Sequence, residues 1–293
     1  MTAQGRAGWW FASPAVAAIV VCFVVPVLAA LALSFTDFDI YGVADRHNVR
    51  FIGLGNYARL FDTPLFWTAL ANTFVFVVVG GPLSIAVSLG AALLVNARVA
   101  RARGGFRTAL FSPVVTTVVA VAVIWRYIFH ARYGFLNYAL GWFGIDAVDW
   151  LGDPHWSMPA MIVFAVWKNF GYNMVILLAG LGAIPAELYE AARLDRATRF
   201  QQLRYITIPA LGPTLLLVTI LTMVGYFQLF AEPYVMTRGG PAQSTTSVLY
   251  FMFEEGFQWW NLGFASAVAF VLFAIMLAGT LVQLALARRW SQP

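Results

Sequence analysis

Six polar side chains lie within, or at the end of, two strongly apolar stretches of this sequence: Lys168, Asn169, Tyr172, Asn173, Gln228 and Glu232. Asn169, Tyr172 and Asn173 lie at positions i, i+3 and i+4, so a helix would present them on one face. Gln228 and Glu232 are likewise four residues apart. Amides and carboxylates hydrogen-bond hydroxyl groups, and an aromatic ring offers a flat apolar face. This combination of groups is suited to binding a sugar.

The composition of the chain predicts an integral membrane protein. Of its 293 residues, 61% are hydrophobic and 11% are charged. A soluble domain carries roughly 25% charged residues, so lipid must solvate most of this surface. The net charge of +5 does not indicate nucleic-acid binding, because the basic residues fall in short clusters between apolar runs. The single cysteine, Cys22, lies in an apolar run and excludes an intrachain disulfide.

Six apolar segments are long enough for a membrane-spanning helix, which needs about 20 residues. The first is longer than the apolar core of a signal peptide, about 7–15 residues, so we expect it to be a retained helix. Pro26 and Pro82 should bend the first and second helices. The sequence therefore predicts an all-α membrane protein with one transmembrane domain over residues 1–293. The predicted helices cover residues 14–34, 69–95, 108–127, 158–181, 208–230 and 262–286.

The depth of the six polar residues leaves two interpretations open. Polar groups are costly against lipid, so they face either a polar cavity or one another. Hydrogen bonds between helices would satisfy them without any solute, and this alternative applies above all to Gln228. Lys168, at about the bilayer midplane, could also extend toward the membrane surface or pair with Glu232.

Arginine placement predicts the orientation of the chain. Short loops rich in Arg or Lys are cytoplasmic, and the arginines cluster before the first helix and after the second, fourth and sixth. The acidic residues lie mostly on the opposite side, so both termini are predicted to be cytoplasmic. The clustered arginines are Arg6, Arg98, Arg101, Arg103, Arg107, Arg193, Arg196, Arg199, Arg204, Arg288 and Arg289.

The sequence contains no pattern for catalysis or for metal binding. A phosphate-binding P-loop needs a glycine-rich turn followed by Lys and Ser or Thr, whereas the only lysine, Lys168, is followed by Asn169. If the protein uses ATP, another chain must bind it, so no cofactor is expected in this one. An intramembrane enzyme is not supported either, because the sequence contains no motif that pairs a nucleophile with a general base. The three histidines are scattered among predicted loops: His47, His130 and His155.

The loop at residues 182–207 carries secondary-structure signals of its own. Pro185 suits the first position of a short helix, which places Glu187 at the positive end of the helix dipole. Thr198 and Gln201 form the pattern of a capping box, which predicts a second short helix. Such a helical pair could insert into a groove on a cytoplasmic partner. The alternative is an amphipathic segment that lies flat on the lipid headgroups.

This loop resembles the EAA loop of ABC importer permeases. The segments 178–189, 234–241 and 33–38 are also similar to that family, so the resemblance covers nearly the whole chain. The subfamily that it most resembles transports carbohydrates or glycerol-3-phosphate, in particular through the first of its two permease subunits. The motif residues that carry the resemblance are Glu190, Ala191, Ala192, Asp195, Ile206, Ile208 and Pro209.

The resemblance implies a type I ABC importer permease fold in the bacterial cytoplasmic (inner) membrane. It implies a second homologous permease, two ATPase subunits that bind ATP and Mg, and an external solute-binding protein, with no nucleic acid. The solute would be a sugar or a related polyol or glycerol phosphate. The loop would dock on one ATPase and drive rocking between inward-open and outward-open states. The coupling residues would be Glu190, Ala191, Ala192, Asp195, Arg196, Ile206 and Pro209.

Two points limit what the resemblance implies. Arg196 occupies the position of a family glycine, and a left-handed conformation there costs an arginine about 1–2 kcal/mol. A secondary transporter or channel without an ATPase is the alternative function. Intramembrane ionisable groups are expected in that class, and only Lys168 lies clearly near mid-depth.

Overall fold

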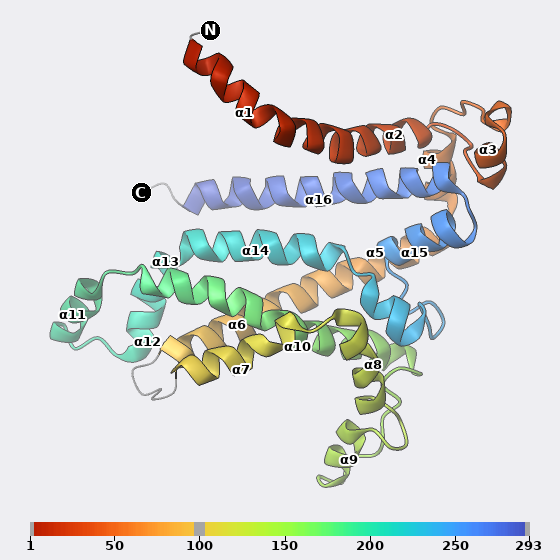
Figure 1. The fold of residues 1–293 in the computed structure, drawn as a ribbon. Coiled ribbons are helices and arrows are strands. Elements are labelled where there is room, and N and C mark those ends of the chain that lie inside the picture. Colours follow the sequence, from red (N-terminus) through yellow and green to blue (C-terminus); the bar gives the residue numbers. More distant parts are fainter. Residues whose placement is uncertain (1–2, 97–102, 291–293) are drawn as a thin grey trace. The chain divides into compact units, whose positions relative to one another are not determined.

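The computed structural model describes residues 3–96 and 103–290 and is built almost entirely of helices (Figure 1). In these two ranges there is no strand, and an isolated antiparallel bridge joins Thr36 to Phe51. The predicted all-α fold is confirmed. Arg98 and Arg101, which contributed to the predicted orientation, lie outside the described residues.

Four helices are long and apolar enough to cross a membrane unbroken: Trp10–Leu33, Pro64–Asn96, Pro154–Gly182 and Leu262–Ala287. Two helix pairs pass the same test but are sharply bent. One bends by 98° and the other by 69°. Among the described residues the count is therefore four spans, or six if each bent pair is one span, as the sequence prediction requires. The bent pairs are Gly104–Val115 with Val118–Ile128, and Arg199–Ala210 with Gly212–Phe227.

The predicted spanning segment over residues 108–127 is interrupted, because the chain breaks between α7 (Arg103–Val115) and α8 (Val118–Ile128). Pro113 has no amide hydrogen to continue the helix, and Thr116 Oγ1 donates to the Pro113 carbonyl at 2.7 Å. Thr117 then adopts an extended conformation, with φ −71° and ψ 133°.

The predicted helix over residues 208–230 is also broken. The break falls at Leu211, between α13 (Ile208–Ala210) and α14 (Gly212–Phe227). Pro213 is the cause, because its ring lacks an amide hydrogen and clashes with the preceding helical turn. The helix before the break, Arg199–Ala210, lies mostly within the loop predicted at residues 182–207, and it meets α14 at a bend of 69°.

A π turn precedes each of the two prolines that were expected to bend helices. Val20–Val24 (η1) comes just before Pro26, and Phe76–Gly80 (η3) comes just before Pro82. Such turns are a recognised cause of helix bending, and Figure 1 shows α1 inclined to α2. The helices that these turns join are α1 (Ala3–Ile19), α2 (Val25–Leu33), α5 (Pro64–Val75) and α6 (Gly81–Asn96).

The chain forms two compact units. The first comprises Met1–Trp67 and Phe251–Ile275, and the second comprises Thr68–Tyr250 and Met276–Pro293. In the first, Asn56 on α4 (Gly55–Asp62) donates to the carbonyls of Ser34 and Thr36 at 2.9 and 2.7 Å. These bonds hold the end of the first membrane helix. The guanidinium of Arg59 also lies 4.3 Å from the centre of the Phe264 ring.

The core of the second unit surrounds α10 (Pro154–Gly182), which packs against α6, α7 and α14. Gly171 permits the close approach of α7, because a Cβ there would lie 2.5 Å from the Leu110 carbonyl oxygen. Small residues at helix contacts serve this purpose in membranes. The buried cluster consists of Ala92, Val95, Met174, Leu177, Leu181, Leu211 and Val218.

Shorter elements connect these helices. They are α3 (Ile40–Ala44), η2 (Arg46–Asn48), α9 (Phe135–Gly141), α11 (Ala186–Leu194), α12 (Arg199–Gln202), η4 (Leu203–Thr207), η5 (Pro233–Thr237), α15 (Val248–Phe253) and η6 (Glu254–Gln258). The last long helix is α16 (Leu262–Trp290).

Candidate functional site

A cavity of about 430 Å³ lies in the second unit, and all six polar residues selected from the sequence line it. This volume is within the range of roughly 300–1,000 Å³ that small-molecule pockets occupy. α10 contributes four of the six, and the segment after α14 contributes two. The complete lining is Phe76, Val114, Lys168, Asn169, Tyr172, Asn173, Leu221, Thr222, Gly225, Tyr226, Gln228, Leu229 and Glu232.

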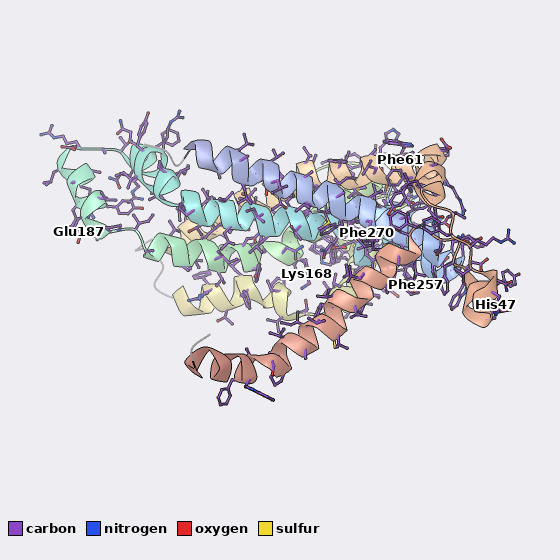
Figure 2. All side chains as sticks on the ribbon, turned by 90° about the horizontal axis from the view of Figure 1, so that it is seen from above. His47, Phe61, Lys168, Glu187, Phe257 and Phe270 are labelled. Carbon is purple, nitrogen blue, oxygen red and sulfur yellow. The ribbon has the colours of Figure 1, made fainter. Side chains whose placement is uncertain are left out.

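Lys168 lies about midway along α10 and is buried (Figure 2). Its Nζ donates to the carbonyls of Pro113 and Val114, at 2.6 and 3.1 Å. These carbonyls belong to the last turn of α7, where the break leaves them without helical donors. The negative end of the helix dipole also favours a cation at this position. Lys168 therefore holds the end of α7, and it forms no salt bridge with Glu232 among the described residues.

The other predicted residues of α10 differ in their exposure. Asn173 is buried, and its Nδ2 donates to Thr222 Oγ1 on α14 at 2.9 Å. This bond is a hydrogen bond between helices, the alternative to solute binding considered in the sequence analysis. The Asn173 amide therefore helps to hold α10 against α14. Tyr172 is 49% exposed and Asn169 is half-buried. Their polar atoms are more accessible to a molecule in the cavity.

Sequence reasoning missed Tyr226, which lines the same cavity. Tyr226 is buried, and its ring stacks on Phe76 with centroids 4.9 Å apart. The hydroxyl has no hydrogen-bond partner within the described part of the chain. Its spacing was a usable signal, because Thr222 and Tyr226 are four residues apart on α14 and share a face.

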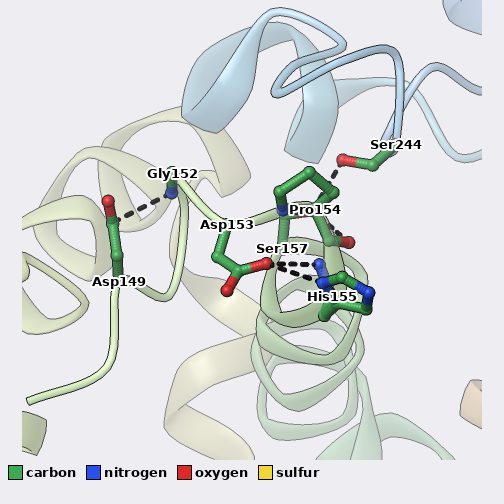
Figure 3. Close-up of polar contacts among 7 residues, drawn as sticks. All are labelled: Asp149, Gly152, Asp153, Pro154, His155, Ser157 and Ser244. Atoms are coloured by element: carbon green, nitrogen blue, oxygen red, sulfur yellow. Dashed lines mark hydrogen bonds and ion pairs between the residues drawn. The ribbon is translucent and has the colours of Figure 1, made fainter.

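The start of α10 is fixed by a side-chain cap at the end away from the 182–207 loop (Figure 3). Asp153 accepts a hydrogen bond from the backbone N–H of His155 at 2.8 Å and contacts His155 Nδ1 at 3.0 Å. The His155 backbone N–H is the main cause that lowers the pKa of Asp153. Ser157 and Ser244 hydroxyls, 2.8 Å apart, tie this end of α10 to the segment after η5. The membrane helix that carries the cavity is thereby anchored at its N-terminal end.

The loop at residues 182–207 contains the two helices that the sequence predicted. α11 begins after Pro185, which is the N-cap and so lies one position earlier than expected. Thr198 and Gln201 form the predicted capping box, with Gln201 Oε1 accepting from the Thr198 N–H at 2.7 Å. The second helix then continues through η4 to Ala210. Glu187 lies on α11 at one end of the unit (Figure 2).

Arg196 adopts the left-handed conformation that its family counterpart, glycine, adopts freely, with φ 56°. It ends α11 in a Schellman motif. The Ala197 N–H donates to the Ala192 carbonyl at 2.8 Å, and the Arg196 N–H donates to the Arg193 carbonyl at 3.1 Å. Arg196 therefore carries the backbone strain that is expected when a residue with a side chain replaces glycine in a left-handed conformation.

The candidate coupling residues fall into two groups by exposure. Glu190, Ala191, Asp195, Arg196 and Pro209 are exposed, and Ala192 and Ile206 are half-buried. A hydrogen bond joins the two helices of the loop: the hydroxyls of Tyr189 and Thr207 lie 2.9 Å apart. Because Thr207 is buried, this bond fixes α11 to the helix that leads into α14.

Comparison with known proteins gives consistent results. A family model described as "binding-protein-dependent transport system inner membrane component" matches residues 84–292. The lactose transport system permease protein of Rhizobium radiobacter is 35% identical over 286 residues, which cover 96% of this chain and 94% of that relative. The arabinooligosaccharides transport system permease protein of Halalkalibacterium halodurans is 32% identical over 274 residues, which cover 93% of this chain and 84% of the relative.

A solved structure has the same fold. One chain of a bacterial ABC transporter involved in the import of the acidic polysaccharide alginate superposes with a TM-score of 0.81 at 22% identity, over 99% of both chains. The match to the family model and the extent of the relatives' similarity decide the assignment. The chain belongs to the family of inner membrane components of binding-protein-dependent transport systems, the permease subunits of ABC importers.

Proposed function

We propose that this permease and a second homologous permease form the path for a sugar or a related polyol or glycerol phosphate, delivered by an external binding protein. The observation that supports this proposal most is the cavity, because it collects Asn169, Tyr172, Gln228 and Glu232 at one place in the membrane unit. Relatives named for the transport of lactose and of arabinooligosaccharides support a carbohydrate solute.

ATP and Mg would be bound by two partner ATPase subunits. The sequence supports the assignment of ATP binding to partner chains, since it contains no glycine-rich P-loop. The exposed face of α11, with Glu190 and Ala191, would seat in a cleft on one ATPase. Small side chains permit close approach there, and the carboxylates offer charge-assisted hydrogen bonds to basic groups.

The test is isolation of the complex from its own membranes by gentle detergent extraction. We expect four further chains to be retained: a second permease, two ATPase subunits and, in the presence of solute, the binding protein. The reconstituted complex should take up solute only with ATP and the binding protein. Solute uptake driven by an ion gradient, with no ATPase retained, would contradict the proposal and favour a secondary transporter.

The orientation of the chain is a second prediction. In a variant whose Cys22 is replaced by Ala, a cysteine at Tyr138 should react with an impermeant maleimide in spheroplasts. A cysteine at Leu194 should react only after the membrane is opened. Both positions are exposed, Tyr138 on α9 and Leu194 at the end of α11, so accessibility depends on the side of the membrane. The reverse pattern of labelling would invert the predicted topology and place both termini outside.

A further inference from the structure

The C-terminal end of α8 carries a hollow that the proposed function does not use. Its volume is about 300 Å³, and it is lined by Val123, Arg126, Tyr127, His130 and Tyr133. The first four lie at positions i, i+3, i+4 and i+7, so they follow one face of α8 and of the turn after it. α8 turns from α7 by 98°, and Val123, Arg126 and Tyr127 on this face are exposed.

The chain around this hollow is basic. Between Arg126 and Ile145 the sequence contains two arginines, Arg126 and Arg132, and no aspartate or glutamate. Within the described residues, Arg126 donates to the Val235 carbonyl alone, at 3.5 Å, and the exposed guanidinium of Arg132 has no hydrogen bond or ion pair. Both lie at the end of the second unit away from the 182–207 loop (Figure 1). If that loop is cytoplasmic, the positive-inside rule does not account for these two charges.

The neighbouring helix α9 adds exposed aromatic rings. Tyr133 also lines a second hollow, of about 530 Å³, which includes Arg132, so the two hollows adjoin at this ring. Further along, Tyr138, Trp142 and Phe143 are 64%, 71% and 80% exposed. Tyrosine and tryptophan are enriched where membrane meets water, because their rings are apolar on one side and polar at one edge.

A buried amide fixes the segment that presents these rings. Asn137 Nδ2 donates to the carbonyls of Ala131 and Val148, at 2.9 and 2.8 Å. Asn137 Oδ1 accepts from Trp150 Nε1 at 2.8 Å. The two arginines and the aromatic rings are therefore held by a folded segment, as a binding surface requires.

We propose that an anionic phospholipid binds against α8, with its phosphate on Arg126 and its acyl chains along the apolar side chains that α8 exposes. Those side chains are Val119, Val123 and Ile124, with 53%, 41% and 57% of their surface exposed. Arginine is well suited to phosphate, because its planar guanidinium donates several hydrogen bonds. Arg132 adds a second positive charge beside the headgroup, and the rings of α9 lie among the headgroups.

Continuity with the membrane favours a lipid over a soluble protein as the occupant. The basic and aromatic end of α8 follows directly on its exposed apolar side chains, and the α7–α8 pair is apolar enough to form a membrane span. A soluble partner would contact the arginines but not the apolar side chains beneath them. A phospholipid has both parts, a charged headgroup and hydrocarbon chains.

The test is photolabelling of the permease, assembled with its partner chains in nanodiscs of phosphatidylcholine. The nanodiscs contain a trace of phosphatidylglycerol or of phosphatidylcholine with the same photoactivatable group in its acyl chain, and peptide mass spectrometry measures labelling of residues 118–128. We expect the anionic probe to label this segment about tenfold more than the neutral probe. Arg126→Gln should lower its labelling to that of the neutral probe, because a charge-assisted hydrogen bond is lost. Arg126→Lys keeps the charge and should retain most of the labelling.

The matched control is Arg50→Gln, which removes an exposed arginine outside both hollows and should leave labelling of α8 unchanged. Excess inorganic phosphate should not compete, since it has no acyl chain. Equal labelling by the two probes in the parent would overturn the proposal, as would equal losses in Arg126→Gln and Arg50→Gln or in Arg126→Gln and Arg126→Lys. Protection of α8 from both probes would also overturn it, by showing that a protein chain covers this face. Competition by phosphate would show a site for free anions instead.

Discussion

Ala191→Trp is expected to lower ATP-driven solute uptake about tenfold or more, with the permease still inserted and assembled. The reason is steric: α11 presents Ala191 outward, and a bulky ring there would overpack any cleft that receives the helix. Overpacking costs about 1–3 kcal/mol, and each 1.4 kcal/mol corresponds to a factor of ten. ATP hydrolysis should continue at the basal rate while uptake falls, because the two are uncoupled.

The measurement is solute uptake per ATP hydrolysed in proteoliposomes, with assembly checked by co-purification of the ATPase. Arg193→Trp is the control, since two helical residues turn the side chain by about 200° onto the opposite face of α11. It should leave coupling much nearer to normal. Full uptake by Ala191→Trp would instead favour the interpretation in which the loop lies flat on the lipid headgroups.

The bond between Tyr189 and Thr207 explains how movement of α11 would reach the membrane helices. The second helix of the loop runs from Arg199 to Ala210 and joins α14 at a bend of 69°. Through the 2.9 Å contact between the two hydroxyls, α11 and this second helix are held together. A displacement of α11 by an ATPase would thus be passed to the base of α14, which carries Thr222 and Tyr226 in the cavity. Rigid-body motion of this kind is typical of alternating access.

Much of this organisation was predictable from patterns that are local in the sequence. The capping box at Thr198 and Gln201 involves residues three apart, and the apolar runs around α10 need no long-range information. The shared face of Asn169, Tyr172 and Asn173 was predictable for the same reason. Each pattern depends only on helical periodicity and on the cost of polar groups in lipid.

The features that were missed depend on contacts between distant segments. Lys168 bonds to Pro113 and Val114, which lie 55 and 54 residues away, and the break of α7 that exposes those carbonyls was not foreseen. Pro113 was visible in the sequence, but a proline within an apolar run is compatible with a bend as well as with a break. Tyr226 was missed because an isolated tyrosine in an apolar helix is usually a packing residue.

Lys168→Met is expected to destabilise the permease by about 2 kcal/mol, because it leaves the Val114 carbonyl without its side-chain donor and the Pro113 carbonyl with the Thr116 hydroxyl alone. Hydrogen bonds to charged groups each contribute about 1.5–3 kcal/mol to stability. Methionine keeps the length and the apolar stem of the side chain, so the lost donor is the main change. The measurement is the free energy of unfolding of the purified permease in mixed micelles, together with solute uptake by the reconstituted complex.

Lys168→Arg is the matched control, since its guanidinium donates several N–H bonds and should recover part of the stability. The opposite result would be equally informative. If Lys168→Met were as stable as the parent but lost solute uptake, the ammonium would have to meet the solute rather than α7. An anionic solute would then have a cationic partner in the cavity, and the structural role assigned to Lys168 would be wrong.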